Sequence, residues 1–115
     1  MAEESSEEND LEKLLSEYQA VQEQLRTFAA ALDQLQNQKE EIERAKQEIN
    51  AATGKVYISV GGVIVETTKE KALADLNERA EMTSLRISTT TKQYNELKNK
   101  EQQLGGKLTQ LYKSQ

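Results

Sequence analysis

The chain has 115 residues and a formal net charge of −5 at pH 7, and it contains no Cys, His, Pro or Trp. A chain of this length forms a single domain or one elongated module. The absence of Cys excludes a disulfide framework and thiolate metal sites, and the absence of His removes the commonest general base and metal ligand. The abundance of Glu, Lys, Gln, Leu and Ala is instead typical of a coiled coil.

The net charge comes entirely from residues 1–10, which contain five acidic residues and no basic one, whereas the remaining chain has fifteen of each. Such a run predicts an acidic, flexible and solvated segment. The acidic start does not resemble a secretory signal, and no apolar run approaches the ~20 residues of a membrane span. We therefore expect a soluble cytoplasmic protein with no membrane contact. Nucleic-acid binding is not expected either, because no basic stripe with interleaved aromatic residues occurs.

A seven-residue apolar repeat begins at Leu11 and continues for six heptads. With Leu11 at position a, ten of the twelve a and d positions are apolar, and the exceptions are Lys39 and Lys46. A repeat of this length predicts a coiled-coil helix, which we place over residues 11–52. Gly54 is expected to end this helix by adopting the left-handed conformation after the last turn.

A short apolar segment over residues 55–67 predicts a β-hairpin. Gly61-Gly62 is suited to a two-residue turn, which would pair Val60 with Val63 in the flanking strands. One face of the hairpin is then aliphatic, and it consists of Val56, Ile58, Val60, Val63 and Val65.

An isolated two-stranded hairpin is marginally stable in water, so this aliphatic face needs a partner. We predict that the five residues form an oligomerisation surface and line a barrel or sandwich shared between subunits. The alternative is that the hairpin folds back against the ends of the helices.

A second helix is predicted over residues 68–112. It is predicted to begin at a capping box, in which the side chains of Thr67 and Glu70 each accept a hydrogen bond from the backbone N–H of the other residue. Nine of the twelve a and d positions from Leu73 onward are apolar. Residues 11–52 carry a net charge of −3 and residues 67–115 a net charge of +3, which favours pairing of the two helices with each other.

The expected fold is therefore mainly α: a long antiparallel two-helix coiled coil with a β-hairpin at its base, in a single domain over residues 11–115. Gly105-Gly106 interrupts the second helix near its end. The pair is either a tolerated surface feature or the source of a flexible tip, because each Gly costs a helix about 1 kcal/mol relative to Ala.

No catalytic constellation is present. The chain has no nucleophile elbow and no phosphate-binding Gly loop, and its carboxylates are spread over surface heptad positions. We expect no enzyme activity, no catalytic residue, no cofactor and no metal site.

The stretch from Val56 to Ala72, VYISVGGVIVETTKEKA, closely resembles the hairpin and second-helix entry of archaeal prefoldin beta-type subunits. The resemblance implies a hetero-hexamer in which four such subunits join two alpha-type subunits through a double β-barrel. It also implies a function, which is the ATP-independent capture of unfolded polypeptides at the coiled-coil tips and their delivery to the group II chaperonin.

Apolar side chains near the helix ends away from the hairpin are the candidates for contact with unfolded polypeptide. They are Leu14, Leu15, Tyr18, Leu108, Leu111 and Tyr112. Several weak contacts of this kind on separate subunits would act together by avidity. The alternative function is a structural coiled-coil adaptor, whose hairpin docks one fixed partner and which holds no client.

Overall fold

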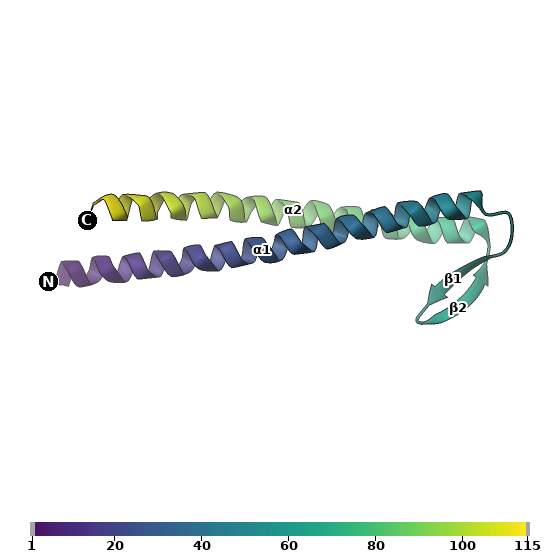
Figure 1. Cartoon of the computed structure of the whole chain (residues 1–115), viewed down its shortest axis with the longest axis horizontal. Helices are drawn as coiled ribbons and strands as arrows, with labels where there is room; N and C mark the ends of the chain where they lie inside the picture. Colours follow the sequence, from purple (N-terminus) through teal and green to yellow (C-terminus); the bar gives the residue numbers. More distant parts are fainter. Residues whose placement is uncertain (1, 115) are drawn as a thin grey trace. The chain divides into compact units, whose positions relative to one another are not determined.

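The structure is a computed structural model that describes the backbone of residues 2–114 and the side chains of residues 8–114. In chain order, a two-stranded antiparallel sheet lies between two long helices (Figure 1). The elements are, in chain order, α1 Ala2–Ala51, β1 Val56–Val60, β2 Val63–Thr67 and α2 Lys69–Lys113. The prediction of a mainly α chain with two long helices and one β-hairpin is confirmed.

The helix α1 begins at Ala2, earlier than the start predicted from the heptad repeat. Glu is a good helix former, and acidic residues near a helix N-terminus interact favourably with the helix dipole, so the helix can begin before the apolar repeat does. The predicted flexibility of residues 1–10 concerns side chains that mostly lie outside the described residues, and it stays a prediction.

The contacts divide the chain into two compact units, which we describe separately. The terminal unit comprises Met1–Ala31 and Thr90–Gln115, and the hairpin unit comprises Leu32–Thr89. Each unit contains one segment of α1 and one of α2, and the hairpin unit also contains both strands.

The core of the terminal unit is a row of heptad residues between α1 and α2. Val21, Leu25 and Leu104 are buried in it. Half-buried side chains pack around these three, and they are Leu14, Tyr18, Tyr94 and Leu97. Because early residues of α1 meet late residues of α2, the two helical segments run antiparallel in this unit (Figure 1).

The predicted heptad register holds in both units. Every predicted a and d position except Lys39 is buried or half-buried. The other Lys at an a position, Lys46, is half-buried, and its Nζ lies 3.3 Å from Oε1 of Glu43. A Lys residue can therefore occupy a seam position when its aliphatic stem is covered and its ammonium group reaches outward.

The β-hairpin has the predicted turn and register. Gly61 and Gly62 have φ values of 55° and 84°, the left-handed region that a two-residue hairpin turn requires. Val60 pairs with Val63, and the ladder continues to the pair formed by Val56 and Thr67.

The junctions between helix and strand differ from the prediction. Gly54 does not have a positive φ, so α1 ends without a left-handed Gly. Instead, the ammonium group of Lys69 donates a hydrogen bond of 2.8 Å to the carbonyl oxygen of Asn50, in the last turn of α1. A cation at this place satisfies one of the carbonyl groups that the helix end leaves without a partner.

The cap of α2 is one residue later than predicted. The hydroxyl of Thr68 accepts a hydrogen bond of 3.2 Å from the backbone N–H of Lys71. Thr68 fills this role because α2 begins at Lys69, so Thr68 and not Thr67 directly precedes the first helical residue. Glu70 remains in the first turn of the helix, where a negative charge interacts favourably with the helix dipole.

Candidate functional site

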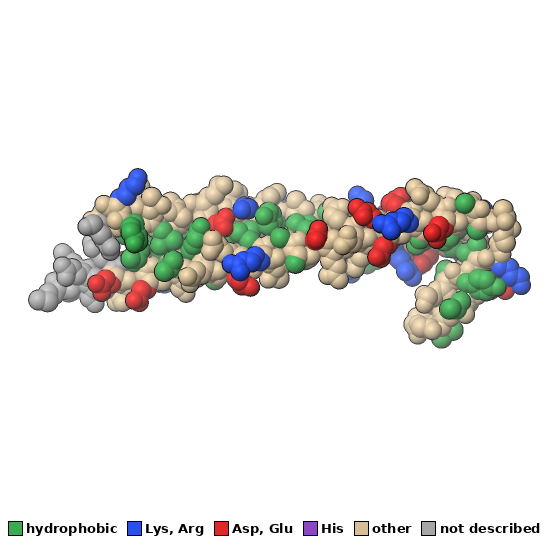
Figure 2. All heavy atoms as spheres, in the orientation of Figure 1, with side chains coloured by type: hydrophobic (Ala, Val, Ile, Leu, Met, Phe, Trp, Pro, Cys, Tyr) green, Lys and Arg blue, Asp and Glu red, His purple; other side chains and the backbone are tan. Residues whose placement is uncertain are grey.

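An apolar groove lies between the two helices of the terminal unit. It has a volume of about 700 Å³. Leu14 and Leu111 form its floor, and polar and charged side chains form its walls, namely Asp10, Lys13 and Glu17 from α1 and Lys107, Gln110 and Ser114 from α2. Figure 2 shows hydrophobic side chains gathered between the helices in this unit.

The groove follows one flank of the helix pair. All of its lining residues occupy heptad positions c, d or g, on both helices. In an antiparallel pair the g positions of the two helices lie on the same flank, opposite the e positions. The groove is therefore a one-sided feature, and the other flank of the unit has a separate surface.

The six predicted client-binding residues divide between these surfaces. Leu14 and Leu111 line the groove. Leu15 and Tyr112, at e positions, are 47% and 76% exposed on the opposite flank. The remaining two, Tyr18 and Leu108, are half-buried in the seam, and no structural observation tests whether any of the six contacts a client.

Gly105 lies against the Tyr18 side chain, but this contact does not require a Gly. A Cβ atom at this position would lie 3.6 Å from Cε2 of Tyr18, which is an ordinary contact distance. Gly106 has nothing within 4 Å of its added Cβ. The helix continues through both residues, and the hydroxyl of Thr109 donates a hydrogen bond of 2.9 Å to the carbonyl oxygen of Gly105.

The predicted oligomerisation surface on the hairpin is only partly free within this chain. Val56 is buried and Ile58 is half-buried, whereas Val60, Val63 and Val65 are exposed. At the base of this face, the chain itself therefore covers the predicted interface side chains. The exposed part is the half next to the turn.

The opposite face of the hairpin also exposes large apolar side chains, although no binding role was predicted for it. Ile64 is 74% exposed, and Tyr57 is exposed on the same face. Exposed Met82 and Leu85 on α2 were missed as well. The heptad count could have found this second pair, because both residues fall at outer positions, c and f, where polar residues are expected.

The described residues contain neither a metal centre nor a membrane segment. Among the side chains of residues 8–114, no group of three or more Asp, Glu, His or Cys is arranged to hold a metal ion. Neither helix, over its described length, is long and apolar enough to cross a membrane.

The architecture has counterparts among known proteins. A family model described as "Prefoldin subunit" matches residues 12–115. Prefoldin subunit beta of Pyrococcus abyssi is 31% identical over 100 residues, which are 85% of this chain and 86% of that protein. Prefoldin subunit beta of Thermoplasma volcanium is 32% identical over 105 residues, which are 89% of this chain and 85% of that protein.

A solved structure agrees with the sequence matches. The crystal structure of the prefoldin beta subunit from Thermococcus strain KS-1 has a TM-score of 0.81 and 28% sequence identity, covering 88% of this chain and 90% of that chain. The resemblance first seen in the hairpin and the start of α2 thus extends over most of the sequence. The chain belongs to the prefoldin family of molecular chaperones.

Proposed function

We propose that this chain is a subunit of an ATP-independent chaperone, which captures unfolded polypeptide at the terminal unit and delivers it to the group II chaperonin. The observation that carries the proposal is the groove over Leu14 and Leu111, together with exposed Leu15 and Tyr112 on the other flank. Apolar surface at the ends of the helices suits a non-native client, since such chains expose apolar side chains of their own.

The affinity of a single terminal unit is expected to be low. Burying one Leu side chain contributes roughly 1.5–3 kcal/mol, and association costs several kcal/mol of translational and rotational freedom. Stable binding of a client therefore needs several terminal units that act together by avidity. This requirement supports an assembly of several subunits.

We infer that the hairpin provides this assembly. Its exposed residues Val60, Val63 and Val65, and both unpaired edges of its two-stranded sheet, would be covered by hairpins of neighbouring subunits. The partner inferred from the family resemblance is an alpha-type prefoldin subunit, in a hexamer of two alpha-type and four beta-type subunits in the cytoplasm.

The test is suppression of aggregation by the complex formed with an alpha-type subunit. A chemically unfolded protein is diluted into buffer without nucleotide, and light scattering is followed. The variant Leu14→Ser/Leu111→Ser should require roughly a hundredfold more complex for the same suppression, because the two lost Leu contacts together weaken binding by about 3 kcal/mol or more. Tyr112→Ser tests an exposed side chain outside the core.

The matched control is Leu85→Ser, which removes a 68% exposed Leu from the hairpin unit. It should leave suppression unchanged, and circular dichroism should show the same helix content in all variants. If the unaltered complex does not suppress aggregation, the chaperone proposal is wrong and the structural adaptor is the better description.

A further inference from the structure

The groove of the terminal unit is lined by the same heptad positions on both helices. On each helix the floor is a Leu at position d, and the wall consists of residues at c and g. The stretch from Asp10 to Glu17 rises about 10 Å along the helix axis, which is two helical turns. The groove is thus long enough for two or three side chains of one ligand segment.

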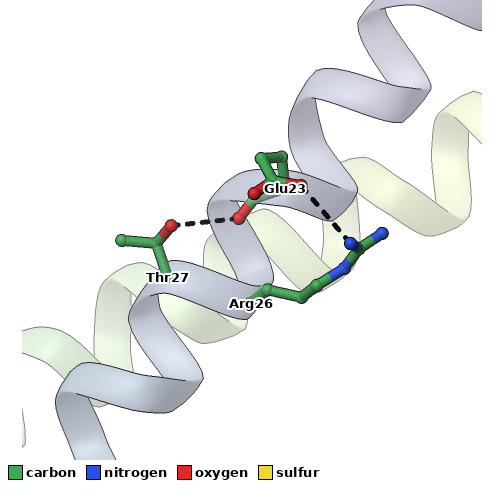
Figure 3. Close-up of polar contacts among 3 residues, drawn as sticks. All are labelled: Glu23, Arg26 and Thr27. Atoms are coloured by element: carbon green, nitrogen blue, oxygen red, sulfur yellow. Dashed lines mark hydrogen bonds and ion pairs between the residues drawn. The ribbon is translucent and has the colours of Figure 1, made fainter.

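The charged side chains on the walls are not paired with each other or with other described side chains. Six ion pairs occur among residues 8–114, and none involves Asp10, Lys13, Glu17 or Lys107. Elsewhere in the same unit charges are paired locally, as Figure 3 shows for Arg26 and Glu23, which lie 3.4 Å apart. The wall charges are therefore available to a ligand.

The two walls differ in charge. The α1 wall has Asp10 and Glu17 at its g positions with Lys13 between them, for a net charge of −1. The α2 wall has Lys107 as its charged residue, for a net charge of +1. A ligand that lies along the floor meets opposite charges on its two sides.

We propose that this groove selects amphipathic helical segments of non-native polypeptides, with an apolar stripe on the floor and flanks of opposite charge. The inference deepens the proposed chaperone function and rests on it. A helix lying in the groove would form a third member of a local helix bundle, which is a common mode of helix recognition. Its acidic flank would face Lys107, and its basic flank would face Asp10 and Glu17.

The backbone explains why a helix fits better than a strand. The backbone N–H groups along the groove are already used within α1 and α2, and near the end of α2 the carbonyl oxygens of Gln110 and Leu111 accept hydrogen bonds from the backbone N–H and the hydroxyl of Ser114. An extended segment would place its own unpaired backbone groups over the leucine floor, where they lose water without gaining partners. A helix pairs these groups internally and buries only side chains.

The test uses fluorescent peptides and the complex of the full-length chain with an alpha-type subunit. Two peptides share one composition: in the first, apolar residues have helical spacing and the charges are separated by flank, and in the second the apolar residues alternate as in a strand. Fluorescence anisotropy should show about tenfold tighter binding of the helical peptide, since the strand-patterned peptide cannot place its apolar side chains together.

A second part of the test examines the wall charges with the variant Lys107→Glu, which makes both walls acidic. This variant should bind the helical peptide with separated charges about threefold more weakly, and a helical peptide with basic residues on both flanks more tightly by a similar factor. Leu85→Ser should change neither affinity, because Leu85 lies in the other unit.

Equal binding of the two peptides of shared composition would overturn the selection of helices. Binding of the helical peptide that does not respond to Lys107→Glu would overturn the role of the walls. If no peptide binds but the complex still suppresses aggregation, this inference fails alone. If aggregation is not suppressed either, the proposed chaperone function fails with it.

Discussion

The hairpin and the terminal unit both expose apolar side chains, but they do so with different residue types. On the hairpin the exposed aliphatic residues are Val60, Val63, Ile64 and Val65, all β-branched and held in one ladder register. In the terminal unit the apolar side chains that are exposed or line the groove are Leu and Tyr, and the walls of the groove are charged.

The difference indicates two kinds of partner. A β-branched side chain has less χ1 freedom than Leu or Tyr, so the hairpin offers a surface of more nearly fixed shape that suits one complementary partner. Leu and Tyr side chains on partly exposed helix positions can adjust, and the charged walls limit how a ligand enters. This difference supports the proposal that the hairpin mediates permanent assembly and the terminal unit mediates transient binding.

The largest effect is expected from a charge on the hairpin. Val63→Asp removes a buried Val contact worth roughly 1.5–3 kcal/mol and adds several kcal/mol for desolvating a carboxylate at the interface. The complex with the alpha-type subunit should be lost, as measured by native mass spectrometry. Helix content should not change, because Val63 is exposed within the chain.

Thr53→Asp is the control for this prediction, since it adds the same charge at an exposed loop residue beside the hairpin. It should assemble normally. A complex of full mass containing Val63→Asp would show that the exposed aliphatic face is not the assembly surface.

A smaller effect is expected from the core of the terminal unit. Leu25→Ala should reduce the stability of this unit by about 2–5 kcal/mol, because Leu25 is buried between Val21 and Leu104. Hydrogen exchange should increase in the terminal segments of both helices, and aggregation suppression should fall while assembly through the hairpin remains.

The neighbouring change Arg26→Ala provides the comparison. It removes an exposed ion pair with Glu23, which is worth no more than about 1 kcal/mol. If Leu25→Ala also caused the complex to dissociate, the proposal that assembly and client binding depend on different units would be wrong.

The smallest effect is expected at Gly106. Gly106→Ala should stabilise α2 by about 1 kcal/mol, since an added Cβ meets nothing within 4 Å and the φ of this residue is not positive. Thermal unfolding of the terminal unit measures the gain.

The same variant separates the two interpretations of the Gly pair. Unchanged aggregation suppression would identify a tolerated surface feature, and weaker suppression would identify a flexible tip that the function needs. Gly62→Ala is a control with the opposite expected sign: it should destabilise the protein, because the φ of 84° at this position strains any residue with a side chain.

Periodic features of this fold were predictable, whereas junctions and surfaces were not. The heptad count from Leu11 identified the buried stripe, and the two glycines of the turn set the ladder register. The cap was placed one residue early because Thr67 and Thr68 are adjacent and identical, and their pattern does not show that the helix begins at Lys69. Leu14 and Leu111 were proposed as contact residues, but the groove that joins them was not anticipated.

The sequence alone determined the two helices and the hairpin register, because each depends on local spacing along one strand or helix, and the resemblance of the stretch from Val56 to Ala72 indicated the family. Only the tertiary structure decided which apolar residues are covered by the chain itself. Val56 and Val63 belong to one predicted face, yet one is buried and the other exposed. That distinction depends on how the hairpin sits against the rest of its unit, and it is what separates the base of the hairpin from its proposed assembly surface.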